Sequence, residues 1–199
     1  MLFLLTGASG AGKSSARRAV EADLAPRVEC VELKDLGPVP AVPDVAWRQR
    51  MAECAVARVG RLDADGRDLL LAGDPVAPGE VVAAPSAAGV DIAVCLLDVD
   101  EATQKRRLRH RGDPEELLGR HVAFAQWMRR HAENPGHVPE VLMNDGWPDM
   151  DWSSLTRSSW GVTVIEGSTL TVAEVGDRVR HWIGAVRAGS APVFRRSGD

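Results

Sequence analysis

The first fifteen residues constrain the fold of this chain more than any other stretch. An apolar run, Leu-Phe-Leu-Leu at residues 2–5, leads through Thr6 into the sequence GASGAGKSS at residues 7–15. A short continuous apolar run is typical of a strand buried on both faces of a parallel sheet. Apolar residues at helical spacing over residues 14–24 predict a helix directly afterwards. The sequence therefore predicts a strand, a tight glycine-rich turn and a helix in immediate succession.

The glycine-rich turn has the spacing G-x-x-x-x-G-K-S, which is the pattern of a phosphate-binding loop. Glycines permit left-handed turns and let bare backbone approach a ligand. Successive N–H groups then form an anion nest, and the following helix N-terminus adds partial positive charge. We expect Lys13 to reach the β- and γ-phosphates of a nucleotide and the Ser14 hydroxyl to ligate Mg²⁺. The predicted nucleotide-binding residues are Gly7, Ala8, Ser9, Gly10, Ala11, Gly12, Lys13, Ser14 and Ser15.

Strand and helix patterns alternate along the rest of the chain. Further strands are predicted at residues 28–33, 68–72, 92–97 and 162–165, and helices at residues 45–62, 101–110, 115–132 and 171–186. This alternation indicates an α/β fold in three layers, with about five parallel strands and helices on both faces of the sheet. A ligand is expected beyond the carboxyl ends of the strands. We expect one domain over residues 1–188 and a loose tail over residues 189–199.

Composition excludes some classes of partner. The formal net charge of −4 argues against a general nucleic-acid or membrane-surface binder, although KRRLRHR at residues 105–111 forms a local positive cluster. No run approaches the ~20 apolar residues of a membrane span. The three cysteines stand among apolar residues without a CxxC pair, which predicts buried, reduced thiols and a cytoplasmic protein.

The order of these motifs resembles the P-loop small-molecule kinases, the group that holds nucleoside monophosphate, shikimate and gluconate kinases and antibiotic phosphotransferases. The resemblance covers residues 1–188 and implies ATP, Mg²⁺ and a mobile helical lid at about residues 107–135. By matching position, Arg107 would flank the adenine or the triphosphate, and Arg111 would close on the phosphates, where arginine neutralises spread negative charge. A solvated basic helix face is the alternative interpretation of these arginines.

The resemblance also implies a carboxylate for the acceptor. In members that phosphorylate hydroxyl groups, an aspartate just past the second strand orients or deprotonates the acceptor. Asp35 matches this position. A capping aspartate of a loop is the equally weighted alternative.

The third strand departs from the pattern of the nucleoside monophosphate kinases, which is a hydrophobic run followed by Asp-Gly-x-Pro-Arg. Here Ala72 stands for the aspartate and Val76 for the arginine. This departure argues against a nucleoside monophosphate substrate, and it leaves the carboxylate near Mg²⁺ to Asp74 or Asp98, of which we prefer Asp74. Gly167 matches the place where these kinases pass backbone along the adenine ring, although a simple turn explains it as well.

Acceptor recognition is the least patterned part of the sequence. We expect the region from Trp47 to Arg50 and a loop over residues 73–89 to shape the acceptor site. Glu80, Arg48 and Arg50 are candidates for acceptor recognition, with surface helix charge as the alternative for the two arginines. The tryptophans at 147, 152 and 160 either cover the acceptor or pin an irregular segment to the core. We expect an ATP- and Mg²⁺-dependent kinase that transfers the γ-phosphoryl group to a small molecule, to a hydroxyl rather than a phosphate. A nucleotide-binding regulatory module with little transfer activity, and a nucleic-acid end kinase that uses KRRLRHR, are the alternatives.

Overall fold

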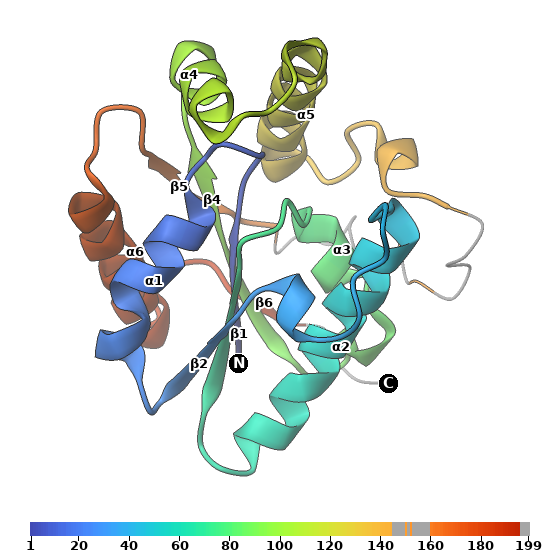
Figure 1. Ribbon diagram of the computed structural model, residues 1–199. Coiled ribbons are helices and arrows are strands. Elements are labelled where there is room, and N and C mark those ends of the chain that lie inside the picture. The colour runs from blue at the N-terminus through green and yellow to red at the C-terminus, as the bar shows by residue number, and fades with distance from the viewer. Residues whose placement is uncertain (145–149, 151, 153–159, 196–199) are drawn as a thin grey trace.

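The computed structural model describes residues 1–144, 150, 152 and 160–195. A parallel sheet in the order β2-β3-β1-β4-β5 forms the centre, and helices cover both of its faces (Figure 1). The parallel strands are β1 (Leu2–Thr6), β2 (Val28–Val31), β3 (Asp68–Ala72), β4 (Asp91–Asp98) and β5 (Thr163–Glu166). The helices are α1 (Lys13–Leu24), α2 (Val45–Asp63), α3 (Pro78–Val82), α4 (Glu101–Arg111), α5 (Glu115–Glu133) and α6 (Val172–Arg187). The predicted three-layer α/β fold is thus confirmed.

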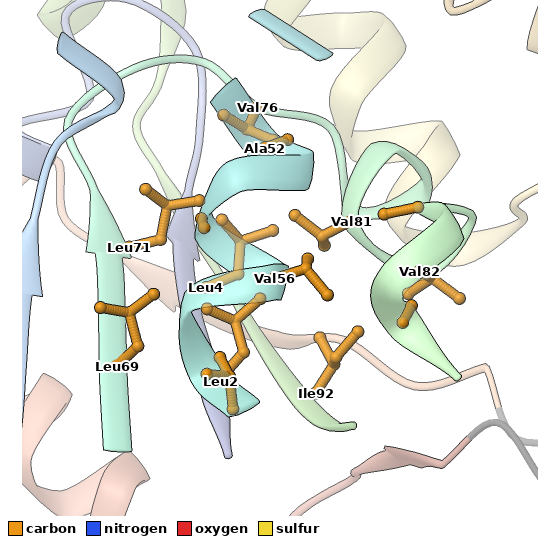
Figure 2. Packing of buried hydrophobic residues seen from close by; sticks show 14 of the residues in the cluster. Leu2, Leu4, Ala52, Val56, Leu69, Leu71, Val76, Val81, Val82 and Ile92 are labelled. Carbon is orange, nitrogen blue, oxygen red and sulfur yellow. The ribbon is translucent and has the colours of Figure 1, made fainter. Parts of the chain in front are cut away.

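Alternate strand residues enter two core clusters, one on each face of the sheet. Leu2 and Leu4 of β1 pack with residues of β3, β4, α2 and α3 (Figure 2). Phe3 and Leu5 point to the other face and pack with residues of α1 and α6. All five residues of β1 are buried, which explains why residues 2–5 are continuously apolar rather than alternating. Burying each leucine contributes about 1.5–3 kcal/mol.

The carboxyl ends of the central strands lie at one edge of the sheet. β1 pairs in parallel with both β3 and β4, with Leu5 opposite Ala72 and Cys95. The loop after β1 and the turn after β3 therefore start side by side. Helices α4 and α5 stand beyond this edge of the sheet (Figure 1). The glycine-rich loop and the basic helix α4 are thus brought to the same edge of the sheet.

The segment after β3 is more structured than the sequence predicted. Residues 73–89 were expected to form a loop because they are rich in proline, glycine and alanine. They contain α3 and a 3-10 turn, Pro85–Ala87, and all five residues of α3 are buried. A side-chain interaction stabilises this short helix, because the Glu80 carboxylate accepts the Ala77 N–H at 2.7 Å. Pro78 and Pro85 do not interrupt a helix, because each stands in the first turn of its element, where proline is tolerated.

The C-terminal region also differs from the loose tail that we expected after residue 188. Phe194–Arg195 forms β6, which pairs antiparallel with the first residues of β4. Phe194 is 5% exposed, and its ring lies 5.1 Å from that of Trp160. This part of the tail therefore joins the core.

Two further expectations concerned the burial of the cysteines and the presence of membrane-spanning helices. Of the three cysteines, Cys95 is buried, Cys30 is half-buried and Cys54 is exposed, so the expectation of three buried thiols was wrong for Cys54. None of the helices in the described ranges has the length and apolar character that crossing a bilayer needs.

Candidate active site

The loop between β1 and α1 has the backbone geometry of an anion site. Gly7 has a φ of 145°, and a Cβ there would lie 2.2 Å from the Leu97 carbonyl oxygen, so no side chain fits. Gly12 is the N-cap of α1 with a φ of 103°, and it supplies no side chain to the first N–H groups of the helix. These groups need another hydrogen-bond acceptor, which a phosphate provides.

The loop forms one wall of a cavity of about 410 Å³. Arg107 and Arg111 of α4 line it, and Gly73 approaches from the turn after β3. The remaining lining residues are Ser9, Gly10, Ala11, Gly12, Lys13, Ser14, Ser15, Ala16, Arg18, Leu170, Val172 and Val175. The structure thus brings together most of the predicted loop residues and both predicted arginines, whereas Gly7 and Ala8 are not among the lining residues.

Lys13 is buried at the start of α1, and its side chain is 4% exposed. Its Nζ donates to the Ala8 carbonyl oxygen at 2.8 Å. Burial lowers the pKa of Lys13 to about 7; Asp74 opposes this shift, and Arg111 adds to it. An anion in the cavity would favour the protonated amine and raise this pKa again.

Glu32 is a site residue that the sequence analysis missed. It follows β2 and is 4% exposed, beside the Ser14 hydroxyl. Burial raises the pKa of Glu32, but the Lys34 ammonium at 2.8 Å, the Ser14 hydroxyl and Arg17 outweigh this and lower it overall. Gly73 makes room for the carboxylate, because a Cβ at that position would lie 2.7 Å from the Glu32 Cδ. The signal for Glu32 in the sequence was its position, because it is an acidic residue at the carboxyl end of a strand, where a ligand is expected.

Two aspartates were candidates for the carboxylate near Mg²⁺, and the structure separates them. Asp74 interacts electrostatically with Lys13, and its Oδ2 accepts the Leu33 N–H at 3.2 Å. Burial raises the pKa of Asp74, while the Leu33 N–H and Lys13 counteract the shift. Asp98 instead accepts from the Arg129 Nε of α5 at 2.6 Å. Asp74 is therefore the candidate beside the phosphate-binding loop.

Helix α4 contacts the loop through two side chains. Arg107 Nη1 donates to the Ala11 carbonyl at 2.9 Å, and its Nη2 donates to the Gly167 carbonyl at 3.1 Å. Gln104, which the sequence analysis also missed, is 1% exposed and donates to the Ser9 carbonyl at 2.9 Å. The Arg107 contacts tie Gly167 to the edge of the cavity. Arg111 lines the cavity while its Nε donates to Asp113 at 2.6 Å.

Asp35, the predicted base, lies outside the residues that line this cavity. It is exposed and ends the short 3-10 turn Leu33–Asp35. Its Oδ2 accepts the Glu32 N–H at 2.8 Å, so its carboxylate caps this turn. Asp35 therefore makes the capping contact that the alternative interpretation of this residue predicted.

The other candidates make intramolecular contacts. In the basic cluster, Lys105 pairs with Glu101, and Arg109 pairs with Glu115. Arg48 of α2 pairs with Glu80 of α3 at 2.6 Å, while Arg50 is exposed. Among the tryptophans, Trp47 and Trp160 donate to the carbonyls of Pro38 and Ala132, Trp152 packs on the core, and Trp147 lies outside the described residues.

Comparison with solved structures finds the same fold in two kinases and in an antibiotic resistance protein. A sugar kinase from Janibacter sp. superposes with a TM-score of 0.55 at 16% identity, covering 94% of this chain and 96% of its own. A gluconokinase from Sinorhizobium meliloti gives 0.53 at 18% identity, with 94% and 93% covered. The tunicamycin resistance protein of Deinococcus radiodurans gives 0.55 at 14% identity, with 96% of each chain covered.

Sequence comparisons add nothing to this result. No protein-family model matches the chain, and no curated protein matches it. The structural comparisons show that the chain has the fold of the P-loop small-molecule kinases, as the order of its motifs predicted.

Proposed function

We propose that this chain is a kinase that transfers the γ-phosphoryl group of ATP, with Mg²⁺, to a small molecule, to a hydroxyl rather than a phosphate. The observation that carries the proposal is the phosphate-binding loop, whose buried Lys13 and uncapped helix start line a cavity together with two arginines. The fold shared with a sugar kinase and a gluconokinase supports it.

Several residues in and beside the cavity have a proposed task. Loop amides and Lys13 hold the β- and γ-phosphates, Arg107 and Arg111 neutralise charge on the transferring group, and Gly167 passes beside the adenine. Ser14 would ligate Mg²⁺, and Glu32 and Asp74 suit its bound waters, because Mg²⁺ prefers oxygen ligands and keeps several waters. Bound Mg²⁺ would neutralise the charge that develops on the phosphates. Helices α4 and α5 would act as the lid.

The proposed reaction is a displacement at the γ-phosphorus. The bond from this phosphorus to the bridging oxygen breaks, and ADP leaves with the electron pair. The acceptor oxygen forms the new bond, and its proton passes to a carboxylate. Asp35 is the base that sequence position predicts, and Asp74 is the carboxylate next to the turn that borders the cavity.

Replacing Lys13 by alanine tests the assignment. We expect Lys13→Ala to abolish ADP release from Mg-ATP across a panel of hydroxylated metabolites, nucleosides and antibiotics, while circular dichroism shows an intact fold. Lys105→Ala is the matched control, because Lys105 is paired with Glu101 on the surface. Undiminished turnover in Lys13→Ala would refute the phosphate assignment. Nucleotide binding by the parent protein without ADP release would favour a regulatory module instead.

A further inference from the structure

A second cavity lies directly beside the proposed phosphate site. Its volume is about 350 Å³, and it is lined by the start of α2, including Asp44, Trp47 and Arg48, and by Asp74 and Pro75 after β3. Gly73 lines the first cavity and Asp74, the next residue, lines the second, so the two cavities lie on either side of this turn. A molecule in the second cavity would therefore lie next to the phosphoryl group held in the first.

Among the described residues that line this second cavity, Arg48 is the one cation, and its charge is already neutralised. Arg48 Nε donates to both Glu80 carboxylate oxygens, at 2.9 and 3.0 Å, and its Nη2 donates to Oε1 at 2.6 Å. Glu80 is fully buried and also accepts the Ala77 N–H. Drawing Arg48 toward a bound anion would leave the Glu80 charge buried and unpaired, which is strongly unfavourable.

The remaining charges at this cavity are negative. Asp44 and Asp74 are both among its lining residues. Asp44 also caps α2 by accepting the Trp47 N–H at 2.7 Å, so its carboxylate already occupies the helix N-terminus that could attract an anion. Lys13 and Lys34 also act electrostatically on Asp74, but Lys13 faces the first cavity, where it would hold the phosphates, and Lys34 is paired with Glu32 at 2.8 Å. A carboxylate or phosphate placed here would face like charge.

We propose, resting on the kinase function above, that the second cavity binds the phosphoryl acceptor and that this acceptor is a hydroxyl compound without phosphate or carboxylate. Hydroxylated amines fit best, because their ammonium group would lie near Asp44, and uncharged polyols fit next. Pro43, Val45 and Pro75 give the cavity an apolar wall for the carbon skeleton of such a molecule. Nucleoside monophosphates and sugar acids are excluded by the same charges.

Acceptors that differ only in charge test this inference. D-glucamine, D-glucitol and D-gluconate share a six-carbon chain with hydroxyls on C2 to C6, and they differ at C1, which carries an ammonium, a hydroxyl or a carboxylate group. Cytidine can likewise be compared with its 5′-monophosphate. Affinities are measured by calorimetry at constant ionic strength with a non-hydrolysable Mg-ATP analogue present. We expect glucamine to bind more tightly than glucitol, gluconate to bind most weakly, and cytidine to exceed its monophosphate. Equal or tighter binding of the anionic members, or no binding of the amine and neutral members, overturns the inference.

Two variants separate charge from fit. Asp44→Asn keeps a good helix cap but removes a charge, and should reduce the preference for glucamine over gluconate by roughly two- to fivefold, the range of one exposed ion pair. Asp100→Asn is the matched control, because Asp100 caps α4 by accepting the Thr103 N–H at 2.7 Å and does not line the cavity. Glu80→Gln should free the Arg48 charge and improve gluconate binding. An unchanged preference in Asp44→Asn contradicts the proposal even if Glu80→Gln does not fold.

The outcome is distinguishable from failure of the kinase proposal. The charge ranking is a binding measurement and needs no phosphoryl transfer, whereas the kinase proposal depends on ADP release and its loss in Lys13→Ala. Turnover with an anionic acceptor would therefore keep the kinase and overturn the acceptor class.

Discussion

At the scale of single residues, the phosphate-binding loop depends on a position where backbone replaces side chain. Gly7 combines a φ of 145° with a Cβ position 2.2 Å from the Leu97 carbonyl oxygen of β4. The Leu97 carbonyl belongs to the backbone, so no side-chain rotation can relieve the contact. Gly7→Ala should therefore lower the free energy of unfolding by about 2 kcal/mol or more. Urea denaturation measures this.

Gly60 provides the control for that substitution. It lies inside α2, and nothing stands within 4 Å of a Cβ added there. Gly60→Ala should raise the free energy of unfolding by about 0.5–1 kcal/mol through helix propensity. A Gly7→Ala protein as stable as the parent would show that the loop can move away from β4.

Asp35 allows a test of chemistry that leaves the fold unchanged. Its carboxylate accepts the Glu32 N–H, and the amide oxygen of asparagine can accept the same bond. If Asp35 is the base, Asp35→Asn should lower the transfer rate about a hundredfold or more with little change in the affinity for ATP. Single-turnover kinetics and calorimetry measure the two quantities. An unchanged rate removes Asp35 from the reaction and leaves Asp74 as the candidate.

At the scale of elements, the sequence located the five long helices to within one residue at each end. The starts of α2 and α4 were predicted to the residue, and in the structure Asp44 and Asp100 cap them by accepting from the N–H of the third residue of each helix. The short helix α3 escaped prediction because its stability comes from burial and from Glu80, which no periodicity reveals in five residues.

The site residues also divide into those that the local sequence predicts and those that depend on tertiary packing. The loop from Gly7 to Ser15 was predictable because all of its motif residues are contiguous in the sequence. Glu32 and Gln104 were missed because their roles depend on which elements become neighbours: Glu32 meets Ser14 only when β2 ends beside the loop, and Gln104 meets Ser9 only when α4 packs over it. Such juxtapositions come from the order of the sheet and not from any local pattern.

Helix α5 contains a buried histidine whose titration should affect stability. His131 is fully buried, stacks on Trp127 at 4.7 Å and accepts the Gly79 N–H at 3.1 Å. Burial lowers its pKa from 6.5 to about 4, with a smaller effect of His137. Between these pH values the unfolded chain binds more protons than the folded one, so stability is lost as pH falls from about 6.5 to about 4, by about 3 kcal/mol.

Urea unfolding at several pH values measures this effect, with His131→Gln as the comparison. Glutamine can still accept from Gly79 but does not titrate, so the dependence in this window should become shallower. The same slope in both proteins would assign the pH dependence to other groups.

At the scale of the whole molecule, both ends of the chain contribute to the sheet. β1, at the N-terminus, lies at its centre between β3 and β4, and β6 adds an antiparallel pair to β4 (Figure 1). The cluster that contains Leu2 and Leu4 also contains Phe194. The face of the sheet opposite α1 and α6 is therefore completed only when residues near the C-terminus have docked.

This closure predicts that Phe194 and its neighbours matter for stability although they do not line the cavity beside the glycine-rich loop. Phe194→Ala removes a buried ring and should cost about 3 kcal/mol, which corresponds to a fall in Tm of roughly 10 °C for a chain of this size. A chain that stops at residue 188 should lose at least as much, whereas Val42→Ala, at a side chain that is 81% exposed, should change stability by less than about 0.5 kcal/mol. Scanning calorimetry of the four proteins decides the matter: an unaltered Tm in the shortened chain would mean that the tail is loose after all, and an equal loss in Val42→Ala would mean that the effect is not specific to the core.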